Sequence, residues 1–319
     1  DASANVTVTN LVVADAGSTT DGVSRVFHNG TSTFEDVTFS GYATVVVRSG
    51  PGADLVDQLD VDETDPDAGG PLQALTSLTL DADNISNTDM SDDTVRIRRS
   101  PVGVTVTMMG GAGSDWFQLF NGDSVDFIQG PVIIDPAPDE GGAADRITIN
   151  DFADTTGDTI VITSTTIEGM SGYAGTPDFT YNGSLAELIE IRTSDNAATG
   201  GDTVNIQSTM LGSVYRIGTG DGDDTVNVSS DAPTNAGTLN DIHGQINLDT
   251  AGGEDTLNVS DLGDTGGDVY DLSFISGGAE AGTTELRFTD GAHAVDIRYD
   301  ETVGGAANSN ALQHINLIG

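Results

Sequence analysis

The chain has 319 residues, and its 51 acidic residues against 10 basic ones give a formal net charge of −41 at pH 7. All the basic residues are arginine, and the resulting negative field excludes nucleic acid and anionic lipid surfaces as natural partners. Because there is no cysteine, disulfides, thiolate metal sites and cysteine catalysis are excluded as well.

The first segment, residues 1–92, contains short runs rich in β-branched residues and separated by Gly, Asn, Asp and Ser. The clearest runs are Leu11-Val12-Val13 and Ala43-Thr44-Val45-Val46-Val47. Alternating apolar residues bounded by turn-forming residues are typical of strands. We therefore predict that residues 1–92 form a divergent or incomplete N-terminal β unit.

From residue 93 onward a regular pattern appears, in which an Asp, often followed by Thr, precedes an apolar-x-apolar triplet. The copies begin at Asp93, Asp115, Asp145, Asp158, Asp202, Asp224, Asp255 and Asp268. The spacings between the first four recur, within one residue, among the last four, and Asp202 follows Asp93 by 109 residues. This internal duplication predicts one unit at residues 93–201 and another at 202–305, with 306–319 as a tail or the start of a next unit.

Hardly any stretch has helical periodicity, so an all-β fold is predicted. The spacing of 22 residues between copies fits one coil of a parallel β-helix, or β-solenoid, and the duplication of 109 residues would then hold about five coils. In each triplet two side chains would point inward and one outward. Tandem β-sandwiches of immunoglobulin or cadherin type, at about 100 residues each, are the alternative.

One stretch, Gly110 to Gln118, reads G-G-x-G-x-D-x-U-x, where U is a large apolar residue. Its glycines allow a tight turn with positive φ, and the Asp can accept amide hydrogen bonds or bind a hard cation. Weaker copies begin at Gly50, Gly218 and Gly252. The stretch resembles the nonapeptide of hemolysin-type, or repeats-in-toxin, calcium-binding repeats. The resemblance implies Ca²⁺ held between adjacent turns by Asp carboxylates and Gly carbonyls, and an extracellular location.

The wider unit also resembles tandem units of very large repetitive surface proteins of bacteria. The matching stretches are Leu239 to Ile246, Asp255 to Asp261 and Asp264 to Asp268. In the hemolysin-type family the nonapeptides run in tandem, whereas here each Gly-Asp turn stands alone. Stacked coils would be needed to bring separate turns together.

The candidate calcium ligands are aspartates at these turns, because hard cations take oxygen ligands and Gly-rich turns leave carbonyls free. They fall into two predicted groups. The first is Asp221, Asp223 and Asp224, with Asp115 and Asp255 at equivalent turns; the second is Asp92, Asp93 and Asp202. The alternative is that these residues form Asx turns and accept backbone amides at strand starts.

The sequence gives little support for catalysis, since lysine is absent and no nucleophile, phosphate-loop or dinucleotide motif occurs. We therefore predict a non-enzymatic structural or adhesive repeat protein, stiffened by Ca²⁺ and located outside the cell or on its surface as part of a fibre, filament or surface layer. Its expected partners are further copies of the repeat protein and surface polysaccharide. Membrane insertion is not expected, because no apolar run is long enough. A secreted polysaccharide lyase or epimerase on a parallel β-helix is the alternative.

Overall fold

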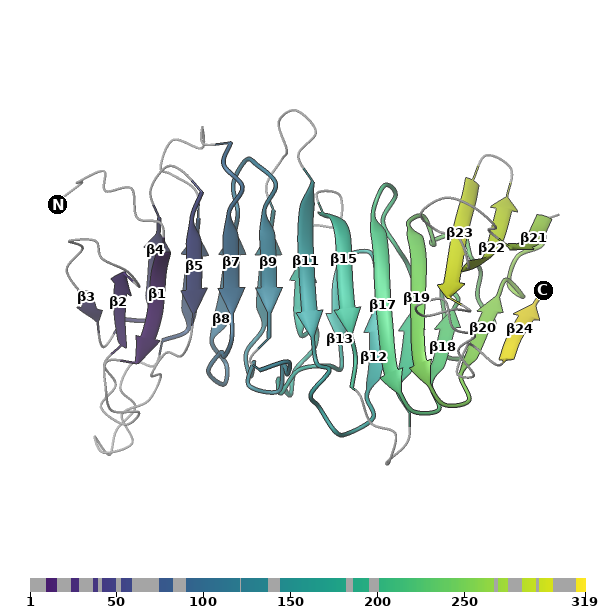
Figure 1. Cartoon of the computed structure of the whole chain (residues 1–319), viewed down its shortest axis with the longest axis horizontal. Helices are drawn as coiled ribbons and strands as arrows, with labels where there is room; N and C mark the ends of the chain where they lie inside the picture. The colour runs from purple at the N-terminus through teal and green to yellow at the C-terminus, as the bar shows by residue number, and fades with distance from the viewer. Residues whose placement is uncertain are drawn as a thin grey trace. The chain divides into compact units, whose positions relative to one another are not determined.

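The computed structural model describes residues 10–15, 24–28, 37–39, 42–49, 53–58, 75–82, 90–120, 122–136, 144–181, 186–194, 201–266, 269–274, 283–290, 293–300 and 314–319. Within these ranges all regular structure is β, with no helix (Figure 1). The chain divides into two compact units. Unit 1 holds Asp1–Ile149 with Ser171–Ala186, and unit 2 holds Asn150–Met170 with Glu187–Gly319.

Unit 1 contains two sheets. Sheet 1A has the strand order β3-β2-β1-β5-β7-β9-β11, and sheet 1B has the order β4-β6-β8-β10-β14. The strands are β1 (Asn10–Asp15), β2 (Ser24–His28), β3 (Val37–Phe39), β4 (Thr44–Arg48), β5 (Leu55–Gln58), β6 (Ser77–Asp81), β7 (Thr94–Ile97), β8 (Thr105–Met109), β9 (Trp116–Leu119), β10 (Val132–Asp135), β11 (Asp145–Asn150) and β14 (Phe179–Tyr181).

Unit 2 is built in the same way. Sheet 2A has the order β15-β17-β19-β23-β22-β21, and sheet 2B has the order β13-β12-β16-β18-β20-β24. The strands are β12 (Thr159–Ile162), β13 (Thr166–Glu168), β15 (Ala186–Arg192), β16 (Thr203–Ile206), β17 (Val214–Asp221), β18 (Thr225–Val228), β19 (Gln245–Gly252), β20 (Thr256–Ser260), β21 (Val269–Phe274), β22 (Thr283–Asp290), β23 (His293–Asp300) and β24 (His314–Ile318).

Outside the antiparallel segments named below, successive strands of a unit alternate between its two sheets, and neighbours within a sheet are mostly parallel. In unit 1, β5, β7 and β9 pair in parallel, while β4, β6 and β8 do so in the other sheet. Antiparallel pairs occur at β1–β2–β3, β12–β13 and β21–β22–β23. The all-β prediction is thus confirmed, and the long parallel sheets are compatible with a β-helix. Immunoglobulin-type sandwiches have antiparallel sheets instead.

The predicted spacing of 22 residues is a true strand-to-strand register at two places. Thr94 pairs with Trp116 in sheet 1A, and Thr203 pairs with Thr225 in sheet 2B. Elsewhere the interval between paired residues is longer. Thr225 pairs with Thr256, and Thr256 pairs with His314 across a stretch that contains the antiparallel strands β21, β22 and β23.

The core of each unit consists of stacked rows of inward-facing side chains. In sheet 1A one row runs through Val56, Val95, Phe117 and Ile147, which are aligned by the strand register and fully buried. The intervening residues face outward, as the period of two in a strand requires. The thin aliphatic core explains why so few aromatic residues suffice.

Outward-facing positions also stack, and in sheet 2B they form a ladder of asparagines. The Nδ2 atom of Asn227 donates to Oδ1 of Asn205 at 3.0 Å. Asn258 donates to Asn227 at 2.9 Å, and Asn316 donates to Asn258 at 2.7 Å. Each rung therefore repeats the hydrogen bond of the rung before it.

The units predicted at 1–92, 93–201, 202–305 and 306–319 are sequence repeats, and their boundaries stay a prediction. The compact units have their boundary at Ile149 and Asn150, and they interleave through residues 171–186. The antiparallel hairpin of β12 and β13 lies in unit 2 next to that segment in sequence.

Among the described residues there is no helix long and apolar enough to cross a membrane.

Candidate metal centre

Four aspartates of unit 2 form a stack at the start of sheet 2B. Asp158, Asp202, Asp224 and Asp255 each stand immediately before a strand, and those strands are neighbours in register. The amide of each aspartate donates to Oδ1 of the next one: Asp158 to Asp202 at 2.7 Å, Asp202 to Asp224 at 2.7 Å, and Asp224 to Asp255 at 3.0 Å. The carboxylates therefore tie neighbouring parallel strands together.

Unit 1 repeats this device at the start of sheet 1A. The amide of Asp54 donates to Asp93 at 2.7 Å, that of Asp93 to Asp115 at 2.8 Å, and that of Asp115 to Asp145 at 2.7 Å. All four residues are buried. The strand-start aspartates thus accept backbone amides, as the Asx alternative held, but the amides belong to an adjacent coil and not to the aspartate's own turn.

The two groups of predicted ligands are divided differently by the structure. Asp202 lies with Asp224 and Asp255 in unit 2, whereas Asp92, Asp93 and Asp115 lie in unit 1. Asp92 is exposed and accepts the amide of Ser114 at 3.0 Å. Asp223 is exposed and accepts the amide of Glu254 at 2.9 Å, while Asp221 is exposed at the end of β17.

The glycines of the motif behave as its sequence predicts. Gly111 and Gly113 both have positive φ, at 97° and 146°. A Cβ on Gly113 would collide with the carbonyl oxygen of Ser91, and one on Gly110 would collide with the carboxylate of Asp115. At the corresponding turn of unit 2, Gly253 has φ 134° and lies against the carbonyl oxygen of Gly222. These glycines allow adjacent turns to pack backbone against backbone.

Burial has an electrostatic cost in the stack of unit 2. It raises the pKa of Asp224 to about 7 from its ordinary value of 3.8, and the charges of Asp255 and Asp202 add to this effect. The nearby Thr219 hydroxyl and the hydrogen bond from the amide of Asp202 act in the opposite direction. Burial also raises the pKa of Asp255. Within the described part of the chain, Oδ2 of each of these two carboxylates has no hydrogen-bond donor in good geometry.

A second group of three carboxylates, which shares Asp158 with the stack, lies at the corner between β11 and β12. Asp151, Asp154 and Asp158 each place an oxygen within 4.8 Å of the others. Asp151 is fully buried, and the other two are half-buried. Three carboxylates this close repel one another unless a cation or protons neutralise them. The cluster could therefore bind a metal ion.

Local hydrogen bonds shape this corner. The amide of Asp154 donates to the carbonyl of Asp151 at 2.9 Å, which closes a tight turn. Oδ1 of Asp154 accepts the amides of Thr155 and Thr156, and its Oδ2 accepts the hydroxyl of Thr156 at 2.7 Å. The amide of Asp151 donates to the carbonyl of Arg192 at 2.9 Å. The corner is thus fixed both to itself and to the strand β15.

The sequence prediction included neither Asp151 nor Asp154 among the ligands, although a signal for them exists. The spacing Asp-x₂-Asp-x₃-Asp recurs at Asp261, Asp264 and Asp268 in the duplicated unit. There the turn has the same hydrogen bond, from the amide of Asp264 to the carbonyl of Asp261 at 3.0 Å. Asp268 lies outside the described residues.

The donor set at Asp151, Asp154 and Asp158 suits a hard cation. Ca²⁺ takes oxygen ligands at about 2.3–2.6 Å, so two ligands on opposite sides of it are separated by roughly 5 Å. The mutual limit of 4.8 Å between the three oxygens falls within that span. No cysteine exists in the chain, and the three residues offer oxygen atoms alone, which disfavours softer metals.

Comparisons with known proteins identify no relative of this chain. The chain matches no protein-family model, no curated protein and no solved structure at a significant level.

Proposed function

We propose that the chain is a calcium-stabilised β-solenoid that serves as a structural or adhesive repeat protein on the cell surface. The observation that carries the proposal is the carboxylate cluster of Asp151, Asp154 and Asp158 at a corner between two strands. A cation bound there neutralises charge in a chain that carries a net charge of −41. It acts as a brace, and no catalytic step is involved.

The solenoid part of the proposal is supported by the alternation of strands between two sheets in each unit. Parallel neighbours with aligned inward residues are what successive coils of a solenoid produce. The stacked Asp and Asn rows add the same hydrogen bond at each coil. Such repetition suits a protein whose task is to hold its length and shape.

The proposed brace also connects neighbouring coils. Asp158 is a member of the cluster, and its amide donates to Asp202, which precedes the next strand of sheet 2B. Asp151 is bound through its amide to Arg192 at the end of β15. A cation at the corner would therefore stabilise the junction of the β11–β12 connection with two further strands, β15 and β16.

Calcium titration by isothermal calorimetry tests the site. We expect the wild-type protein, after treatment with a chelator, to bind Ca²⁺ more tightly than Mg²⁺, because three clustered carboxylates suit the larger ion's flexible coordination. Asp158→Asn removes one charged ligand and leaves the backbone hydrogen bonds to Asp202 and Thr203 in place. Its affinity should fall by about tenfold or more, the equivalent of roughly 1.4 kcal/mol.

The matched control is Asp241→Asn, which removes the same charge from an exposed position of unit 2. Equal loss of calcium affinity in both variants would mean that bulk charge, and not the corner, attracts the ion. The structural role is tested separately by electron microscopy of the calcium-loaded protein. Filaments or ordered arrays that disappear with chelator support it, whereas a chelator-insensitive monomer contradicts it.

A further inference from the structure

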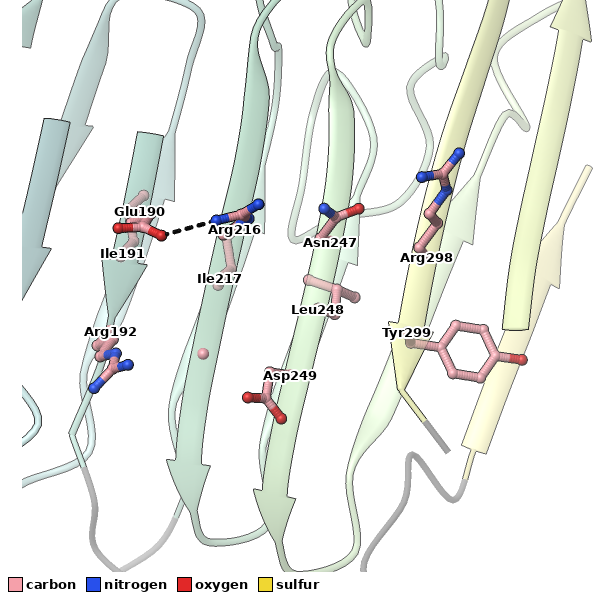
Figure 2. A pocket seen from close by; sticks show the side chains of 11 residues that line it. Glu190, Ile191, Arg192, Arg216, Ile217, Asn247, Leu248, Asp249, Arg298 and Tyr299 are labelled. Atoms are coloured by element: carbon pink, nitrogen blue, oxygen red, sulfur yellow. Dashed lines mark hydrogen bonds and ion pairs between the residues drawn. The ribbon is translucent and has the colours of Figure 1, made fainter. Parts of the chain in front are cut away.

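The outer face of sheet 2A carries a shallow groove of about 270 Å³ across β15, β17, β19 and β23 (Figure 2). All the strands that form it belong to unit 2. Its polar lining residues are Glu190, Arg192, Arg216, Asn247, Asp249 and Arg298. The groove therefore concentrates three of the chain's ten arginines in one place.

Strand register arranges these side chains in two rows across the sheet. In the first row Glu190 is aligned with Arg216, Arg216 with Asn247, and Asn247 with Arg298. In the second row Gly218 stands between Arg192 and Asp249. The residues between the rows, such as Ile217, face the core.

The hollow of the second row exists because Gly218 has no side chain. The backbone does not require glycine at this position, since no positive φ is recorded for Gly218. A Cβ there would meet its nearest neighbours, Cγ of Arg192 and the carbonyl oxygen of Asp249, at 3.9 Å, which is ordinary van der Waals contact. Glycine inside a strand weakens it or marks a close approach by a ligand or another backbone.

The arginines of the groove differ in how far they are neutralised. Arg216 pairs with Glu190 at 3.2 Å, and Arg298 pairs with Glu285 at 3.1 Å. Arg192 is exposed, and it forms no ion pair with the residues that the structure describes. Its planar guanidinium can form two parallel hydrogen bonds to a carboxylate.

The remaining groups indicate what else the ligand carries. Asn247 and the carboxylates of Glu190 and Asp249 can accept hydrogen bonds from hydroxyl groups, and the Asn247 amide can donate. Two carboxylates in the lining repel a densely charged polymer such as a sulfated glycan or a nucleic acid. A ligand with one carboxylate among several hydroxyls has no such conflict.

We propose that this groove binds an acidic saccharide, with Arg192 holding the carboxylate of a uronate unit and Asn247 and Asp249 holding its hydroxyls above Gly218. The groove adjoins the aspartate corner through the backbone of Arg192, whose carbonyl accepts the Asp151 amide, but none of the three clustered carboxylates lines it. The proposed contacts do not include bound Ca²⁺. It would give the scaffold a defined contact with a saccharide in which a uronate unit stands among neutral sugars.

The test is calorimetric titration of the whole chain with a disaccharide of one glucuronate and one neutral sugar, in the presence of a chelator, which prevents bridging of uronates through calcium. Three variants probe the groove: Arg192→Ala, Arg192→Lys and Gly218→Val. We expect the dissociation constant to rise by about tenfold or more in Arg192→Ala, and less in Arg192→Lys, which keeps the charge but loses the fork. Gly218→Val should abolish binding by filling the hollow, while valine suits a strand.

Arg48→Ala is the control, because Arg48 lies on β4 of unit 1 and is 42% exposed. It should bind like the wild type, and melting curves should show that all variants are folded. Three outcomes would overturn the proposal: unchanged binding in Arg192→Ala and Gly218→Val, equally strong binding of neutral maltooligosaccharide, or competition by inorganic sulfate at the concentration of the uronate. None of them bears on the calcium brace, so the two proposals fail separately.

Discussion

At the scale of single residues, the strand-start aspartate provides a hydrogen-bond acceptor, which no apolar or basic side chain could provide. Its Oδ1 atom accepts the amide of the aspartate before the neighbouring parallel strand, and its short side chain allows it to be buried at a tight turn. The consequence is a row of buried carboxylates, and Asp224 shows their cost most clearly. Because its pKa in the folded protein is about 7, the folded state holds its proton more firmly than the unfolded chain does.

This linkage predicts how stability changes with pH in metal-free protein. The contribution of Asp224 is most favourable below pH 3.8 and is lost as the pH rises to about 7, since the unfolded carboxyl ionises first. Asp224→Asn keeps an oxygen that can accept the amide of Asp202 and removes the charge. Urea unfolding in chelator should show this variant more stable than the wild type by about 2 kcal/mol at pH 8, with little difference near pH 4.

Asp241→Asn serves as the reference here too, because it changes the net charge equally at an exposed site. If Asp224→Asn and Asp241→Asn gained the same stability at pH 8, relief of general repulsion would explain both. If Asp224→Asn were instead less stable at pH 8, the ionised carboxylate would be contributing favourably, and the raised pKa would be contradicted.

At the scale of elements, the sequence predicted the strands better than the turns. Strand starts could be predicted because Asp and the apolar-x-apolar triplet report burial and period directly, as at Asp93 and Asp202. Among the described strand pairs, the spacing of 22 residues is the pairing interval at β7–β9 and β16–β18, whereas between β20 and β24 three further strands intervene. The corner at Asp151 was missed because its chemistry arises from the closure of a turn, which brings together residues that no strand pattern distinguishes.

Turn glycines provide a prediction at the same scale. Gly113 and Gly103 both have positive φ, but only Gly113 lies where a Cβ would strike backbone, whereas Gly103 has nothing within 4 Å. Gly113→Ala should therefore lower the free energy of unfolding by about 3 kcal/mol, and Gly103→Ala by about 1 kcal/mol from backbone strain alone. Chemical denaturation of both variants measures the difference. Equal losses would show that the packing of the turn against Ser91 contributes nothing.

At the scale of the whole molecule, charge is the dominant constraint. With 51 acidic residues and ten arginines, the chain has about five carboxylates for each arginine. Such self-repulsion opposes the compact state and is relieved by counter-ions. Two kinds of relief can be distinguished. Monovalent salt screens exposed charges generally, whereas a bound divalent ion acts at a defined site and adds stability by mass action.

These two effects predict different melting behaviour. Sodium chloride should raise the melting temperature of metal-free protein gradually, without saturation at low millimolar concentration. Calcium chloride at matched ionic strength should raise it further and then level off, with a gain of about 2.7 kcal/mol when the ion is at 100 times its dissociation constant. Asp158→Asn should remove the calcium-specific step and keep the response to sodium, because the lost ligand belongs to the corner cluster. Identical curves for the two salts would reduce the role of calcium to screening, and the corner would then be a strained turn without a resident ion.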